Sequence, residues 1–144
     1  MKSKVIFCCL VMLSCLIPQT FSQNSDTEER NPNAPKNTFK IPGAEIYVSG
    51  SDEASRMPWD VAKSACACKG DGWRLPTIGE LQIIYGYKDM FGNFSREYYW
   101  AYDQRMYSGR FYNLNFKNGR ISDEEIGEDN KVRCIWSPKK PEEH

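Results

Sequence analysis

The sequence contains a single histidine and has no excess of positive charge. The only histidine, His144, is the last residue, so a histidine-based catalytic dyad or triad inside a folded domain is excluded. Lysine and arginine together number 19, and aspartate and glutamate together also number 19. Proteins that bind nucleic acid or anionic lipid usually carry a basic patch or a basic net charge. The composition therefore indicates no nucleic-acid partner.

A hydrophobic run long enough to cross a membrane is also missing. A membrane-spanning helix needs ~20 apolar residues, whereas the apolar run at 5–18 is shorter, follows a basic start and precedes the small residue Ser22. This pattern is typical of a secretory signal peptide over residues 1–22. Leu13-Ser14-Cys15 loosely resembles a lipobox, so a lipoprotein anchored through Cys15 is the alternative. We expect no transmembrane segment and a secreted, periplasmic or cell-surface protein.

Cysteine is scarce after the signal segment. Only Cys66, Cys68 and Cys134 remain, which in an oxidising compartment gives one disulfide and one odd thiol. Cys66-Ala67-Cys68 is not the Cys-x-x-Cys of a redox helix, and without a second cysteine pair or a partner histidine it cannot fill a four-ligand zinc site. Cys68 is left as a free thiol, an alternative partner of Cys134, or a link to another chain. We expect no metal centre and no cofactor.

Composition also divides the remaining chain. Residues 23–44 are mostly polar, and their few apolar side chains cannot offset the entropy lost on ordering, so this segment is predicted to be a flexible leader. One domain is predicted over 45–137, beginning with a strand at 46–48. Residues 138–144 are predicted to form a charged tail.

The stretch from Gly72 to Leu81 organises the predicted domain. Pro76 favours an extended connector before it. Thr77 and Glu80 have the spacing of a reciprocal capping box and predict a helix that begins there and runs to about Tyr85. Its inward residues are predicted to be Leu81, Ile84 and Tyr85, and Gly86 is expected to end it.

An earlier helix is predicted over 59–68, with Pro58 at its first position. Trp59, Ala62 and Cys66 recur at i, i+3 and i+7, which places them on one face. At ~100° per residue, Cys66 faces the core and Cys68 lies on roughly the opposite side.

The second half of the domain is predicted to be antiparallel β structure. Asn118-Gly119 predicts a type I′ hairpin turn that puts Tyr112, Leu114 and Phe116 on one face. In the last strand Cys134 and Trp136 share the buried side by alternation. The predicted strands are 98–102, 109–116, 120–122 and 131–136.

Two stretches in this half suggest binding chemistry. Aromatic rings that stack, interspersed with hydrogen-bonding side chains, suit a sugar or a peptide. Since at least half of the rings must be core, the candidates are those in a presumed loop: Tyr102, Asp103, Gln104, Arg105 and Tyr107. The acidic stretch Asp123–Asn130 offers the oxygen ligands that calcium prefers, but it matches no EF-hand loop. A solvated loop between strands is the favoured interpretation of it.

The motifs, taken in order, resemble a known family. The matching residues are Trp59-x-x-Ala62-x-x-x-Cys66, Gly72-Trp73-Arg74-Leu75-Pro76-Thr77-x-x-Glu80-Leu81, Tyr99-Trp100 and Val132-Arg133-Cys134. From about Tyr47 to Trp136 the chain resembles the Lcl C-terminal domain family of bacterial secreted and surface proteins, and the related Fibrobacter succinogenes major domain family. The resemblance implies an α+β, C-type-lectin-like fold with two short helices and a curled antiparallel sheet. It also implies a disulfide from the first helix to the last strand, here Cys66 to Cys134.

The resemblance limits the function that can be expected. The Glu-Pro-Asn or Gln-Pro-Asp loop and the Trp-Asn-Asp strand of calcium-dependent sugar-binding lectins are absent, so lectin activity does not follow from the fold. The catalytic cysteine pair of the formylglycine-generating enzymes has no counterpart either. We expect a non-enzymatic binding module whose segment from about Phe91 to Arg110 contacts an unknown extracellular glycan or protein. The alternative is a structural component of a surface assembly, such as an adhesin- or fimbria-like subunit.

Overall fold

A computed structural model describes residues 29–106 and 108–138 of the chain. The expected signal peptide with Cys15, the candidate residue Tyr107 and most of the charged tail lie outside the described residues. The elements are β1 (Thr38–Lys40), β2 (Tyr47–Ser49), α1 (Trp59–Ala67), β3 (Trp73–Arg74), α2 (Ile78–Gly86), α3 (Lys88–Phe91), β4 (Tyr98–Arg105), β5 (Arg110–Asn115), β6 (Ile121–Glu125) and β7 (Ile135–Trp136).

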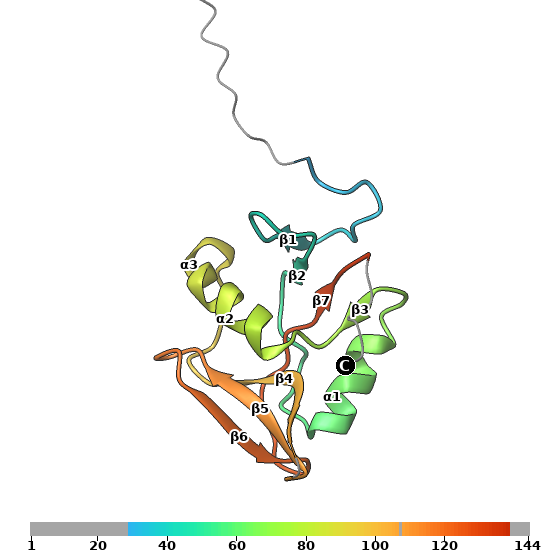
Figure 1. Cartoon of the computed structure of the whole chain (residues 1–144). Helices are drawn as coiled ribbons and strands as arrows, with labels where there is room; N and C mark the ends of the chain where they lie inside the picture. Colours follow the sequence, from blue (N-terminus) through green and yellow to red (C-terminus); the bar gives the residue numbers. More distant parts are fainter. Residues whose placement is uncertain (1–28, 107, 139–144) are drawn as a thin grey trace, which may run out of the picture.

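The strands form two antiparallel sheets (Figure 1). One has the order β1-β2-β7-β3, so a strand from the start of the domain pairs with the last strand, with Tyr47 opposite Trp136. The other is the β4-β5-β6 meander. The two are linked at Lys131, whose N–H donates to the Tyr98 carbonyl and whose carbonyl accepts from Trp100.

Hydrophobic cores lie on both faces of the β4-β5-β6 sheet. Successive side chains of a strand point to opposite faces, and in β5 the buried Phe111 belongs to one core while the buried Leu114 belongs to the other. The Leu114 core includes Leu81 and Ile84 of α2. The Phe111 core includes Ala62 and Cys66 of α1. Helices α1 and α2 therefore cover opposite faces of one sheet.

The capping box at the start of α2 is confirmed. The Thr77 hydroxyl accepts from the Glu80 N–H at 3.2 Å, and a Glu80 carboxylate oxygen accepts from the Thr77 N–H at 2.7 Å. Leu81 and Ile84 are buried as predicted, and Tyr85 is half-buried against the same core. A third short helix, α3, follows directly and was not predicted.

The phase of α1 is confirmed, but the predicted place of Pro58 is wrong. Ala62 and Cys66 are buried and Trp59 packs beside them. Pro58 has an extended ψ of 157°, so it is the residue before the helix. The backbone N–H of Trp59 donates to the Ile126 carbonyl and so anchors the start of the helix. Proline has no backbone N–H and could not form this bond.

Part of the predicted flexible leader, residues 23–44, is ordered, because β1 lies within it and pairs with β2. Phe39 of β1 pairs with Val48, and Thr38 is buried. Arg30 donates to the Thr38 carbonyl at 2.8 Å and stacks over the Tyr47 ring at 5.2 Å. These contacts compensate for the small number of apolar residues. The remaining domain boundaries stay predictions.

The predicted strand boundaries and the hairpin turn also need correction. The hairpin between β5 and β6 is present, but only Gly119 has a positive φ, so the turn is not type I′. Instead the Asn115 carbonyl accepts from Gly119 at 2.7 Å, and the Asn115 side chain accepts from Lys117 at 2.8 Å. Strand β7 is shorter than the predicted 131–136, and it is buried on both sides.

Candidate functional site

Four of the candidate residues from the sequence, 102–105, lie on a strand and not on a loop, because β4 continues to Arg105. Tyr102 is half-buried, its ring centroid 6.3 Å from that of Trp59. The Lys63 ammonium lies 5.2 Å from the Tyr102 ring and 5.3 Å from the Trp59 ring. Tyr102 therefore belongs to the contact between the sheet and α1.

The other described candidates have different partners. The Asp103 carboxylate accepts from the N–H of Ile78, the first residue of α2, and so stabilises the start of that helix. Arg105 binds Asp123 at 2.9 Å, and Gln104 is exposed. These side chains do not converge on one cleft, and a ligand role for any of them stays a prediction.

The acidic stretch is partly a strand, which corrects its interpretation as a loop. Asp123, Glu124 and Glu125 belong to β6. The hydrogen bond from Arg110, together with the charges of Arg105 and Arg110, outweighs desolvation and lowers the pKa of Asp123. The Glu124 carboxylate accepts from the Asn130 amide. Within residues 29–106 and 108–138, no group of three or more His, Cys, Asp or Glu side chains is placed to hold a metal ion.

A cleft of about 410 Å³ opens between residues 88–96 and the residues 116–117 of the β5–β6 hairpin. Phe116 joins the two segments, since its N–H donates to the Glu97 carbonyl at 2.9 Å and its ring stacks on Phe94 at 4.7 Å. The cleft is lined by Lys88, Asp89, Gly92, Asn93, Phe94, Arg96, Phe116 and Lys117. The beginning of the segment 91–110, which the sequence predicts to contact a ligand, therefore lines a cavity.

A buried arginine supports two residues of the cleft wall. The Arg133 side chain is 0% exposed and binds Asp52 at 2.6 Å. It also donates to the Ser49 carbonyl at 3.0 Å and to the Asn93 carbonyl at 2.7 Å. Its guanidinium carbon lies 4.0 Å from the centre of the Phe94 ring. One side chain thus fixes both the backbone and the ring that form the cleft wall.

A tyrosine completes the same network. The Tyr99 hydroxyl donates to Asp52 at 2.8 Å and accepts from the Ser95 N–H at 2.8 Å. Burial, and then the Asp52 carboxylate, raise the pKa of Tyr99 from its usual 10.0 to about 12 and outweigh the lowering effect of the bonds with Ser95. Sequence reasoning missed this network. The signal that could have found it is the single charge, Arg133, in an otherwise apolar segment that ends at Trp136.

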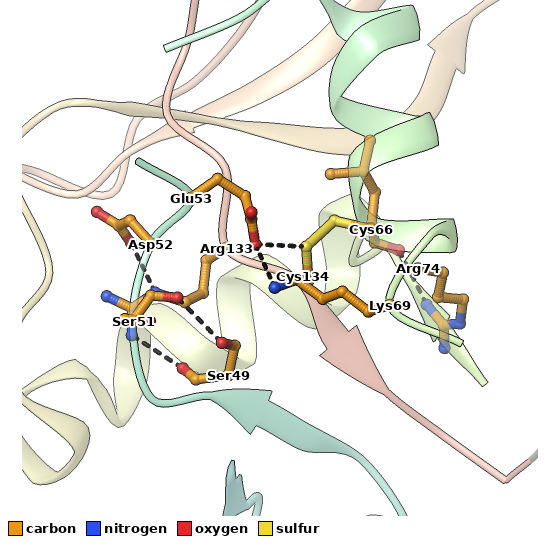
Figure 2. The surroundings of a disulfide bond; sticks show 10 residues. Ser49, Ser51, Asp52, Glu53, Cys66, Lys69, Arg74, Arg133 and Cys134 are labelled. Carbon is orange, nitrogen blue, oxygen red and sulfur yellow. Dashed lines mark hydrogen bonds and ion pairs between the residues drawn. A yellow bond between two sulfur atoms is a disulfide. The ribbon is translucent and has the colours of Figure 1, made fainter. Parts of the chain in front are cut away.

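The predicted disulfide is present. Cys66 of α1 and Cys134, next to β7, are bonded, with their Cα atoms 5.4 Å apart. Figure 2 shows that Glu53 lies beside the bridge, where it pairs with Lys69 at 2.8 Å. Figure 2 also shows that Arg133, adjacent to Cys134, points toward Asp52 and Ser49. The bridge and the buried ion pair therefore anchor one segment at two neighbouring residues. Cys68 is exposed and not bonded to another cysteine.

Comparisons with known proteins place the fold. No family model and no curated protein matches the chain. The crystal structure of botrocetin matches with a TM-score of 0.53 at 10% identity, over 73% of this chain and 99% of that chain. The snake venom toxin convulxin matches at 0.54 with 12% identity, over 74% and 99%.

A third structure is EMS16, an antagonist of the collagen receptor integrin alpha2beta1. It matches at a TM-score of 0.52 with 12% identity, over 72% of this chain and 99% of that chain. The chain spans nearly the full length of each of these C-type-lectin-like proteins. At such low identity the likeness speaks for the fold alone. The chain therefore has an α+β, C-type-lectin-like fold.

Proposed function

We propose that this chain is a secreted or surface-located, non-enzymatic binding module for an extracellular glycan or protein. The observation that carries the proposal is a preformed cleft on a C-type-lectin-like frame whose wall is fixed by the buried Arg133. A wall that is ordered before binding loses little conformational entropy when a ligand arrives. EMS16, which shares the fold, is described as an antagonist of the collagen receptor integrin alpha2beta1.

An extracytoplasmic location is part of the proposal. The Cys66–Cys134 bridge suits an oxidising compartment. Among the described residues, no helix is long and apolar enough to cross a membrane. The resemblance to the Lcl C-terminal domain family supports a bacterial surface or secreted protein.

The second candidate is a structural role in a surface assembly. Two observations favour it. Strand β1 is at the edge of its sheet and can pair with another chain, and Cys68 is exposed and available for a link between chains.

The test is a binding screen of the secreted chain against immobilised glycans and purified extracellular proteins, with size-exclusion chromatography of the same sample. We expect saturable binding by a monomer. Concentration-dependent self-association without binding to any probe would favour the assembly role. A chain that is monomeric and binds no probe would contradict both.

A further inference from the structure

The charges around the cleft are unbalanced. Lys88, Arg96 and Lys117 contribute three cations, and Asp89 contributes the single carboxylate. The Asp89 side chain is 92% exposed, and its contact with the Lys88 ammonium is 3.3 Å, so this pair is weak. Arg96 and Lys117 are exposed, and neither side chain bonds to another residue of the described ranges 29–106 and 108–138. The cleft therefore has at least two cations without a counter-charge.

The aromatic side chains of the cleft add to its positive character. Arg133 lies 4.0 Å from the centre of the Phe94 ring, and Phe116 stacks on the same ring at 4.7 Å. Both cannot occupy one face at these distances, so they cover opposite faces and only the ring edge can meet the cleft. The edge of an aromatic ring carries the positive part of its quadrupole. Phe94 thus offers a ligand a positive edge and no free face for stacking a sugar ring.

The size of the cleft limits the ligand. A volume of about 410 Å³ falls at the lower end of the range of roughly 300–1,000 Å³ that small-molecule pockets occupy. The wall at Asn93 and Phe94 is held by Arg133. The cations of Arg96 and Lys117 project from exposed side chains that can adjust. This combination fits a compact ligand that is recognised by charge.

We infer that the cleft binds a small organic anion with two or more carboxylate or phosphate groups. Arg96 would bind one group through its planar fork, and Lys117 would bind the other as a point charge. Lys88, whose ammonium lies 4.8 Å from the centre of the Tyr85 ring and 3.3 Å from Asp89, adds positive charge beside the ligand. The inference goes beyond the proposed function, because it assigns this cleft a ligand that is neither a glycan nor a protein.

The experiment is a titration of the ¹⁵N-labelled, disulfide-bonded chain with citrate at low ionic strength, followed by amide chemical shifts. A second arm uses inorganic pyrophosphate, which distinguishes phosphate groups from carboxylates. We expect saturable shifts at residues 88–97 and 116–117 with at least one of these probes, weakened by added salt. The double variant Arg96→Gln/Lys117→Gln is expected to bind at least about tenfold more weakly, because two charge-assisted contacts are removed.

The matched control is Lys36→Gln/Arg120→Gln. It removes the same net charge from two exposed side chains that do not line the cleft, and it is expected to keep the affinity of the unmodified chain. The inference is overturned if neither probe causes saturable shifts at the cleft. Equal weakening by both double variants would also overturn it, because general charge would then explain binding. A chain that fails here and still binds a glycan or protein in the screen would retain the proposed function without this ligand class.

Discussion

At the scale of single residues, Arg133 is a buried charge that connects three separate segments of the chain. It has no exposed side-chain surface, and it bonds to Asp52 and to the carbonyls of Ser49 and Asn93. A buried charge is tolerated only when it is paired and its donors are satisfied. The same side chain stabilises the fold and shapes the cleft, so its effects on stability and on ligand affinity are coupled.

Arg133→Met is therefore expected to destabilise the fold strongly. It removes the guanidinium and leaves the Asp52 carboxylate with the Tyr99 hydroxyl but without its charge partner. Breaking a buried pair costs about 3–5 kcal/mol. Urea unfolding of the disulfide-bonded chain measures the change. The control is Arg56→Met, which breaks the pair with Glu97, where the side chains are 53% and 37% exposed. This control should cost less than about 1 kcal/mol, and equal losses in the two variants would contradict the role of burial.

At the scale of elements, α2 depends on the bonds around its first turn. Glu80 accepts from the Thr77 N–H and binds Arg74 through two contacts of 2.7 Å. Burial raises the pKa of Glu80, but the bonds and charge of Arg74 and the bonds with Thr77 outweigh it, so the pKa lies below its usual value of 4.5.

This pKa shift predicts a pH-dependent effect of Glu80→Gln. A carboxylate whose pKa is lowered by folding stabilises the protein above its unfolded pKa, and this contribution is lost as the pH falls through the folded value. We expect the variant to lose about 1–3 kcal/mol at neutral pH, the range for hydrogen bonds to charged groups. The difference from the unmodified chain should shrink as the pH falls below 4.5. Unfolding curves across this range measure it, and a difference that does not change with pH would contradict the assignment.

The hairpin turn gives a second test at this scale, because it touches α2. Gly119 has φ +75°, and a Cβ there would lie 2.8 Å from the Tyr85 ring. Gly109 has φ +64°, and a Cβ there would meet no atom within 4 Å. Both alanine variants carry the backbone penalty of about 1–2 kcal/mol. Gly119→Ala should cost about 1–3 kcal/mol more, because the ring must move. Thermal unfolding compares the two, and equal costs would show that the hairpin does not pack tightly on α2.

At the scale of the whole molecule, the disulfide joins two parts of the chain that are 68 residues apart. Closing a loop of this length lowers the entropy of the unfolded chain and stabilises the native state by on the order of 4 kcal/mol. Typical domains have a total stability of about 5–15 kcal/mol, so this is a large share.

Reduction is therefore expected to lower the melting temperature markedly. A Cys68→Ser variant serves as the background, because it cannot exchange thiols with the bridge and its bridge should form normally. Mass mapping of a non-reduced digest of the unmodified chain checks the pairing and should give a peptide that joins α1 to the segment ending in Trp136. A peptide that joins Cys68 to Cys134 would contradict the phase of α1.

The sequence by itself determined the features that depend on near neighbours. The capping box needs only Thr77 and Glu80 three residues apart, and the inward direction of Cys66 needs only the helical period. The α+β class followed from such local patterns together with the resemblance, and the structural matches confirm it.

Only the tertiary structure decided where the cleft lies and why Arg133 is buried. The cleft joins residues 88–96 to residues 116–117, and its wall is held by a residue from the end of the domain. The hairpin turn also differs from the type I′ turn that Asn118-Gly119 predicts. In the folded chain Gly119 packs against Tyr85 of α2, and the Asn115 side chain accepts a hydrogen bond within the turn. Such features depend on which distant segments meet. The free energy of burying a charge or a ring is set by those partners, and the local sequence does not contain them.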